Sequence, residues 1–119
     1  MAQWVKYEQS TKSGFVAYYN PMSIKAEGDL RSVLILKNYY EPKIYDAEQP
    51  HFKYSSTIAT QLVNCKDNSY KNLRIQIWSL RAGNGELKKD YDYSNKENWT
   101  KVKDGSIQEA LHQKICLTI

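Results

Sequence analysis

Two cysteines and two histidines are the residues of this sequence best suited to chemistry. Cys65, Cys116, His51 and His112 could together hold zinc, but zinc ligands usually come in closely spaced pairs and neither histidine has such a spacing. His112 precedes Cys116 by one helical turn, so the two could face each other as in Cys–His catalysis, which requires a free thiol. The simpler interpretation is a disulfide-bonded Cys116 and a solvent-facing His112.

Catalytic motifs of other kinds are missing from the sequence. It has no glycine-rich phosphate loop and no nucleophile elbow. A Ser–His–Asp arrangement assembles only in space, and a chain with two histidines offers few ways to build one. Asp90 and Asp92 would share a strand face, which a solvated edge strand explains as well as a cation site does. We therefore predict a binding protein and not an enzyme, with no cofactor and no metal.

Cations and tyrosines around two predicted turns and one loop are the candidates for contact with a partner. These candidates are Arg81, Lys88, Lys89, Lys66, Lys71, Tyr45, Tyr70, Tyr91 and Tyr93. If the two hairpins point the same way, their cations form one basic edge interleaved with aromatic rings. Such an edge suits single-stranded nucleic acid, and it suits a protein or glycan equally well. The alternative is an ordinary solvated edge, on which lysines discourage strand pairing.

Short aromatic and branched segments separated by turns predict the strands that position these residues. The expected strands cover residues 4–7, 15–19, 30–40, 54–65 and 73–80, and Tyr91 and Tyr93 have the spacing of one strand face in the polar segment 86–98. The apolar run 30–40 is branched on both faces, which is typical of a central strand covered on both sides. Residues 41–53 are expected to be a loop, and the glycines of residues 81–85 indicate a hairpin turn.

One helix is predicted near the C-terminus. Ser106 and Glu109 have the spacing of a capping box, in which the serine accepts from the Glu109 amide and the glutamate side chain reaches back. An apolar stripe at helical spacing, which should lie on the sheet, consists of Ile107, Ala110, Leu111 and Ile115. Cys116 lies about 100° round the helix from Ile115, at the helix edge or just past its end, where it can reach a neighbouring strand.

These elements together predict an α+β fold. We expect an antiparallel meander sheet of five or six strands with one C-terminal helix packed on one face and linked to the sheet by a Cys65–Cys116 disulfide. A chain of 119 residues is one domain, residues 1–119, in which residues 1–2 are a leftover of expression. Its 10 Tyr, 3 Trp and 2 Phe supply the core area that its few aliphatic residues do not. A disulfide closing so long a loop would stabilise the fold by roughly 2–4 kcal/mol.

The sequence gives only indirect information about the cellular compartment of the protein. No stretch is long and apolar enough to cross a bilayer, and no secretory hydrophobic region is present at the N-terminus. The protein is therefore either cytoplasmic or a mature form whose signal peptide was removed, and a disulfide favours export. The net charge of +4 is compatible with anionic partners of several kinds and equally with ordinary surface lysines.

Landmarks along the whole chain point to a known family. They are Trp4, Tyr18-Tyr19-Asn20, Tyr54-Ser55-Ser56, Val63-Asn64-Cys65, Trp99, Val102 through Gly105-Ser106, and Cys116. In this order and spacing, the sequence resembles the surface-adhesin protein E family of Gram-negative bacteria. It departs from the family at three turn positions: Asn20 and Asn64 stand where members often have Asp, and Asp104 stands where Pro is common.

The resemblance implies an exported protein of the outer membrane, cell surface or periplasm, not membrane-spanning, lipid-anchored in full length in many members and compatible with a homodimer. It also implies the sheet, helix and disulfide expected above. The best-known members look like adhesins that hold host matrix and serum proteins such as laminin, vitronectin and plasminogen.

The expected function is therefore that of an exported cell-envelope binding module with a protein partner and no nucleic acid, because export would separate it from nucleic acids. The alternative is a periplasmic structural, inhibitor or accessory protein that binds another envelope component of the bacterium.

Overall fold

The computed structural model describes residues 3–10, 12, 14–44, 53–94 and 98–116, which form one antiparallel sheet and one α-helix. The strands are β1 (Val5–Ser10), β2 (Phe15–Tyr19), β3 (Lys25–Glu27), β4 (Leu30–Ile44), β5 (Lys53–Asn64), β6 (Ser69–Trp78), β7 (Leu87–Asp92) and β8 (Thr100–Lys101). The helical elements are the 3₁₀ turns η1 (Pro21–Ser23) and η2 (Arg81–Gly83) and the α-helix α1 (Ile107–Cys116). The α+β class is as predicted.

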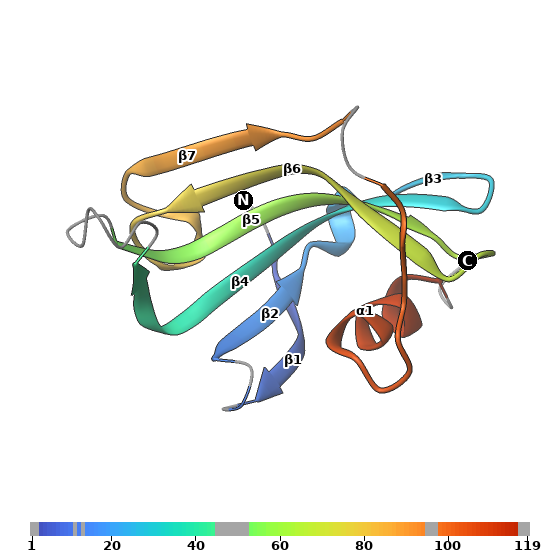
Figure 1. The fold of residues 1–119 in the computed structure, drawn as a ribbon, viewed down its shortest axis with the longest axis horizontal. Helices are drawn as coiled ribbons and strands as arrows, with labels where there is room; N and C mark the ends of the chain where they lie inside the picture. The colour runs from blue at the N-terminus through green and yellow to red at the C-terminus, as the bar shows by residue number, and fades with distance from the viewer. Residues whose placement is uncertain (1–2, 11, 13, 45–52, 95–97, 117–119) are drawn as a thin grey trace.

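The main path of the sheet runs in the order β1-β2-β4-β5-β6-β7, with each strand antiparallel to its neighbours (Figure 1). The short strand β3 pairs with β4, and β8 pairs with β6. The predicted meander of five or six strands is confirmed in this main path, and the two short strands lie beside it. Hairpin connections suffice for such an order, because antiparallel neighbours can be joined by tight turns.

The expected loop 41–53 is partly wrong, because both flanking strands continue into it. β4 reaches Ile44 and β5 begins at Lys53, and these two residues pair with each other. Pro42, the first of two prolines in the stretch 41–53, lies where the β4–β5 register shifts between Asn38 and Lys43. A ladder interrupted in this way tolerates a residue without an N–H. Residues 45–52 lie outside the described residues.

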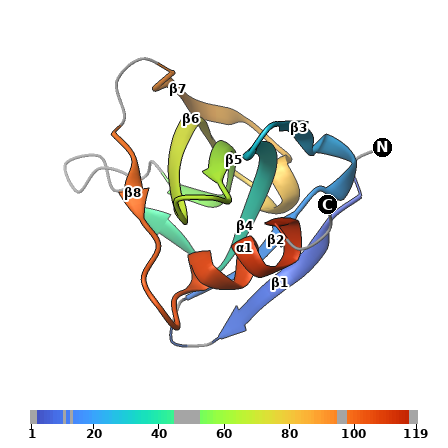
Figure 2. The same ribbon diagram turned by 90° about the vertical axis from the view of Figure 1, so that its right-hand side faces the viewer.

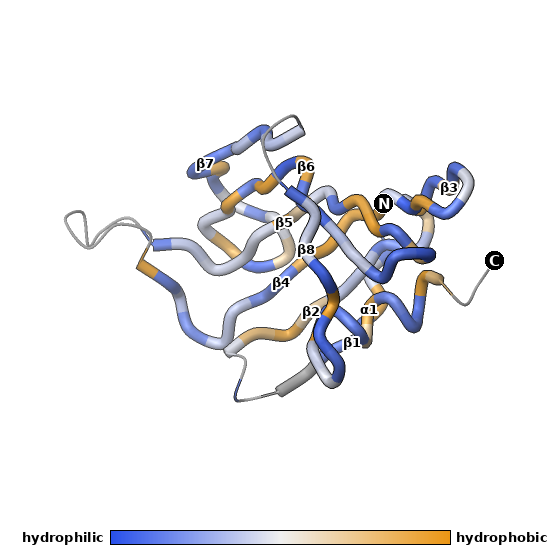
Figure 3. The backbone as a smooth tube through the Cα atoms, turned by 45° about the vertical axis from the view of Figure 1, so that its right-hand side comes forward, coloured by the Kyte–Doolittle hydropathy of each residue, from blue (hydrophilic) through white to orange (hydrophobic). Residues whose placement is uncertain are grey.

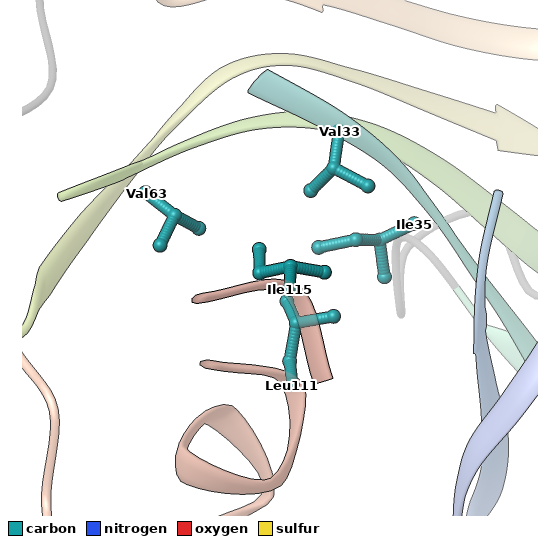
Figure 4. Close-up of a cluster of buried hydrophobic side chains, with 5 residues drawn as sticks. All are labelled: Val33, Ile35, Val63, Leu111 and Ile115. Carbon is teal, nitrogen blue, oxygen red and sulfur yellow. The ribbon is translucent and has the colours of Figure 1, made fainter. Parts of the chain in front are cut away.

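The sheet curls strongly, and α1 lies on its concave face near the turn that joins β5 to β6 (Figures 1 and 2). Leu111 and Ile115 of the helix point toward Val33, Ile35 and Val63 of β4 and β5, and all five side chains are buried (Figure 4). The predicted apolar stripe therefore docks on the sheet as expected. Burial of such aliphatic side chains is the main stabilising term of the core.

The predicted disulfide is confirmed. Cys65, the residue after β5, is bonded to Cys116, the last residue of α1, with their Cα atoms 5.6 Å apart. The capping box also forms at the start of the helix. The Glu109 amide donates to Ser106 Oγ at 3.1 Å, and Glu109 Oε1 accepts from the amide of Gly105 at 3.0 Å, one residue before the expected donor. Both ends of the helix are thus fixed, one by its cap and one by the disulfide.

The expectation that His112 faces solvent is wrong, because only 4% of the residue is exposed. His112 follows Leu111 directly, and its ring is nearly perpendicular to that of Tyr70 on β6, with 6.4 Å between ring centroids. A concave sheet covers a wider arc of a helix than a flat sheet does, so a residue 100° from the apolar stripe can still be enclosed.

The turn that contains η2 packs on the face of β5 opposite to the helix, because Ser56 and Val63 lie on opposite faces of this strand. Ser56 is fully buried there; its hydroxyl donates to the Leu80 carbonyl at 2.6 Å and accepts from the Gly83 amide at 3.0 Å. Gly83 has φ +71°, and a Cβ at this position would lie 2.5 Å from Ile58 Cδ1. Glycine is therefore required here for both its conformation and its size.

Candidate binding site

The concave face of the sheet and the first turn of α1 enclose a hollow of about 540 Å³. Its lining is mainly aromatic and aliphatic, and the rings come from Tyr7, Phe15, Tyr39, Tyr54 and Tyr70. They meet because β1, β2, β4, β5 and β6 are neighbours in the sheet and the register places Phe15 opposite Tyr39. The hollow is thus a consequence of strand register and curvature.

Three of the rings pack edge to face across neighbouring strands. Phe15 and Tyr39 are directly opposed in the β2–β4 ladder, with ring centroids 5.8 Å apart, and Tyr54 contacts Tyr39 at 5.5 Å. Edge-to-face contact is the favoured geometry for such pairs. Burial raises the pKa of the Tyr39 phenol, although a hydrogen bond with Thr57 opposes the shift. Burial, with a smaller contribution from Glu8, also raises the pKa of Tyr7. Both phenols therefore remain neutral at physiological pH.

Lys37 brings a cation into this aromatic lining. It lies on β4 on the same face as Ile35 and Tyr39, and its Nζ lies 4.9 Å from the centre of the Phe15 ring. Burial lowers the pKa of Lys37. Among the lining residues that the structure describes there is no Asp or Glu. The ammonium is thus stabilised by a cation–π contact and not by a carboxylate.

A group of side-chain amides closes the hollow on the side of the helix. Gln108 Nε2 donates to Gln61 Oε1 at 2.5 Å, and Gln61 Nε2 donates to Asn72 Oδ1 at 3.2 Å. Gln61 is 5% exposed, so these hydrogen bonds satisfy a buried amide. They also connect α1 with β5 and β6, which fixes the width of the hollow on this side.

The single basic edge considered in the sequence analysis does not form. The β5–β6 turn, which carries Lys66, and the β6–β7 turn, which carries Arg81, lie at opposite ends of β6 (Figure 1). In a meander consecutive hairpins necessarily turn at opposite ends of the strands. The two turns also differ in character, since residues 66–69 are hydrophilic throughout whereas the chain around η2 includes hydrophobic residues (Figure 3).

The end of the sheet around η2 combines cations with exposed apolar side chains. We call it the η2 end and define it by Tyr40, Leu80, Arg81, Leu87 and Lys89. Arg81 and Lys89 are exposed, and the exposed fractions of Leu80, Leu87 and Tyr40 are 57%, 38% and 38%. The Arg81 guanidinium donates to the Tyr40 carbonyl at 3.1 Å, which holds η2 against β4.

Lys88, another predicted contact residue, is less available than its neighbours. It is half-buried, and its Nζ forms an ion pair with Glu86 Oε1 at 3.2 Å. At the opposite end of the sheet, Lys66 is exposed, whereas Lys71 is half-buried with its Nζ 4.9 Å from the centre of the Trp99 ring. Lys71 and Lys88 are thus less accessible to a partner than the exposed Arg81, Lys89 and Lys66.

The predicted tyrosines occupy three different places. Tyr70 lines the hollow, and Tyr45 lies outside the described residues. Tyr91 and Tyr93 stack on each other with centroids 5.9 Å apart, as their shared strand face predicts. They are half-buried, so the exposed part of each ring can contact a partner.

Neither a metal site nor a membrane span is found in the described part of the chain. No group of three His, Cys, Asp or Glu side chains gathers there, and no described helix is long and apolar enough to cross a membrane. Asp90 forms an ion pair with Arg74, whose hydrogen bond lowers the pKa of that carboxyl. Asp90, one of the two carboxylates considered as a cation site, therefore has a partner within the protein.

The hollow was missed by sequence reasoning, although one signal for it was present. Val33, Ile35, Lys37 and Tyr39 alternate along β4, so a lysine stands at an inward position of the central strand. A cation at a core position is costly unless something compensates it. That anomaly could have indicated an enclosed polar site, but the rings around it come from five strands and could not be assembled without the register.

His112 is expected to make the stability of the protein fall at acidic pH. Neither ring nitrogen has a hydrogen-bond partner in the described structure, and burial lowers the pKa below 6.5. The folded state then binds the proton less tightly than the unfolded chain. The contribution of His112 to the free energy of unfolding is therefore complete above the pKa that this histidine has in the unfolded chain. As the pH falls below that pKa, the free energy of unfolding declines by at most about 1.4 kcal/mol for each pH unit.

Urea unfolding at several pH values between about 7.5 and 5.5 would measure this decline. His112→Leu should flatten the dependence of stability on pH, because it removes the buried titrating group. The carboxylates of the protein are the same in both proteins, so their contribution remains. Gln113→Leu, which places leucine at the neighbouring exposed position of the same helix, serves as the matched control and should keep the original slope. A His112→Leu profile as steep as that of the unmodified protein would contradict the assignment.

Comparison with known proteins gives a consistent result. The family model described as surface-adhesin protein E matches residues 4–117. Two crystal structures of Haemophilus influenzae protein E share the fold. The selenomethionine form has a TM-score of 0.66 at 15% identity, covering 99% of this chain and 95% of that one. Crystal form II has a TM-score of 0.67 at 16% identity, covering 98% of this chain and 97% of that one. No curated protein matches this chain in sequence.

Proposed function

The chain belongs to the surface-adhesin protein E family, and from this premise we propose that it is an exported binding module that contacts extracellular-matrix or serum proteins of a host. The observation that carries the proposal is the extent of the family match, which covers residues 4–117 and therefore the sheet, the helix and the disulfide together. The proposed activity is adhesion to a protein partner and not catalysis.

We place the contact at the η2 end, because its composition is that of a protein interface. Arginine and apolar side chains are favoured at the buried centre of interfaces, whereas lysine is depleted there. Leu80 and Leu87 expose apolar area beside Arg81, and the guanidinium is already ordered by its bond to the Tyr40 carbonyl. An ordered side chain loses less conformational entropy when a partner binds. The β5–β6 turn offers Lys66 without comparable apolar neighbours.

Charge reversal at the η2 end should therefore weaken adhesion. We expect the Arg81→Glu/Lys89→Glu variant to bind immobilised laminin or vitronectin about tenfold or more weakly, as is typical when a central interface residue is lost. Binding should be measured near 0.15 M salt, where the Debye length of about 8 Å screens distant charges. Lys88 is left unchanged because it is already paired with Glu86.

Lys66→Glu/Lys103→Glu is the matched control, since it makes the same change in net charge with two exposed lysines away from η2. This control should bind nearly as well as the unmodified protein and keep its melting temperature. Arg81→Glu also removes the bond to the Tyr40 carbonyl, so binding is compared at a temperature at which circular dichroism shows both variants to be folded. Equal weakening in the two variants would show that only net charge matters and would refute the η2 end. If no matrix or serum protein binds and one bacterial envelope protein is captured instead, the alternative accessory function replaces adhesion.

A further inference from the structure

The hollow on the concave face has the properties of a small-molecule site, and it is not used by the proposed adhesive contact. Its volume of about 540 Å³ lies within the usual range of ligand pockets, about 300–1,000 Å³. Its lining combines aromatic and aliphatic side chains with a few polar groups, which is the usual composition of such sites. The hollow adjoins the core cluster and shares Ile35 with it, but the other four members of the cluster, Val33, Val63, Leu111 and Ile115, do not line it.

The charge inside the hollow is unbalanced. Lys37 supplies an ammonium, and the lining residues that the structure describes include no carboxylate. The lysine forms no ion pair within the described residues, and its contact with the Phe15 ring is the interaction that compensates its burial. Desolvation also lowers the pKa of Lys37, as expected for a cation without a counter-ion. An anionic group brought by a ligand would complete this site.

The surroundings of Lys37 also favour a flat apolar body on that ligand. Tyr39 packs edge to face with both Phe15 and Tyr54, and an additional ring can extend the same geometry. Asn72 accepts from Gln61 through its carbonyl oxygen, which leaves its amide N–H groups to donate toward a ligand oxygen. Cation, rings and amide line one hollow although they come from β2, β4, β5 and β6.

We propose that this hollow binds a small aromatic carboxylate, with the carboxylate on the Lys37 ammonium and the ring among Phe15, Tyr39 and Tyr54. The geometry that carries the proposal is a partly buried cation in an aromatic lining of ligand size, with no carboxylate among the lining residues that the structure describes. The proposal does not depend on the adhesive function, because the residues that define the η2 end are not part of the lining.

The test uses 2-naphthylacetate and its neutral analogue 2-naphthylacetamide, titrated into the whole chain and followed by protein NMR and calorimetry. We expect the carboxylate to bind with a dissociation constant in or below the millimolar range and to shift resonances of Lys37 and Tyr39. The amide should bind about tenfold or more weakly, because it cannot form a charge-assisted hydrogen bond with the ammonium.

Lys37→Met should remove this preference, because it keeps the apolar stem and removes the charge. Its melting temperature should be no lower than that of the unmodified protein, since a buried charge is lost. Lys37→Arg should retain part of the preference for the carboxylate. Lys43→Met is the matched control: its Nζ lies 5.6 Å from the centre of the Tyr39 ring, but Lys43 is not part of the lining, so the affinity should stay within about threefold.

Four results would overturn the proposal. The first is no binding of the carboxylate at millimolar concentration, and the second is equal binding of the carboxylate and the amide. The third is an unchanged carboxylate affinity in Lys37→Met. A short peptide ending in phenylalanine serves as a further probe, and if it bound more tightly than 2-naphthylacetate, the ligand would be a protein C-terminus and the small-molecule assignment would be wrong.

Discussion

Replacing both Cys65 and Cys116 by alanine is expected to lower the free energy of unfolding by about 4 kcal/mol. The disulfide joins positions 51 residues apart, so it removes much of the freedom of the unfolded chain, and this effect grows with the logarithm of loop length. Both cysteines also pack against the buried core cluster, so alanine removes apolar contact in the folded state as well. For a domain whose total stability is about 5–15 kcal/mol, this loss is large.

Urea unfolding of the double variant and of the unmodified protein would measure the loss directly. Intact mass after thiol alkylation, with and without reductant, should first show that the bond is formed in the protein used. Reduction of the unmodified protein is the control, because it breaks the same bond and leaves both sulfur atoms in place. Equal unfolding midpoints for the oxidised protein and the double variant would contradict a stabilising role for the disulfide.

The parts of the fold that the sequence predicts correctly are those specified by neighbouring residues. Ser106 and Glu109 mark the helix start because a cap is built within one turn. Gly83 marks the β6–β7 turn because few other residues adopt its positive φ. With two cysteines in the chain, the pairing of Cys65 with Cys116 had no competitor once a disulfide was assumed.

The features that the sequence does not predict depend on how residues far apart in the chain are brought together. Lys66 and Arg81 were considered as one basic edge, but the meander separates them by the length of β6. His112 was expected in solvent, but the curl of the sheet encloses it. The hollow around Lys37 depends on the register of five strands. Periodicity assigns residues to a face but does not give the curvature of that face.

Truncation of the helix at its buried centre is the second large effect that we expect. Leu111 has no exposed surface and packs among Val33, Ile35, Val63 and Ile115 (Figure 4). Leu111→Ala removes apolar area and leaves a cavity that a tightly packed core fills only in part. We expect the free energy of unfolding to fall by about 2–5 kcal/mol, to be measured by urea denaturation at neutral pH.

Two further variants separate loss of packing from loss of helix propensity. Gln113→Ala changes an exposed residue of the same helix and should alter the stability by no more than about 0.5 kcal/mol. Leu111→Met conserves volume and should cost less than about 1.5 kcal/mol. The loss of stability should be largest for Leu111→Ala, smaller for Leu111→Met and smallest for Gln113→Ala. This order is expected only if the Leu111 side chain docks α1 on the sheet. If Leu111→Ala lost no more stability than Gln113→Ala, the helix would have to be held on the sheet by its other links, such as the Cys65–Cys116 bond and the Gln108–Gln61 hydrogen bond.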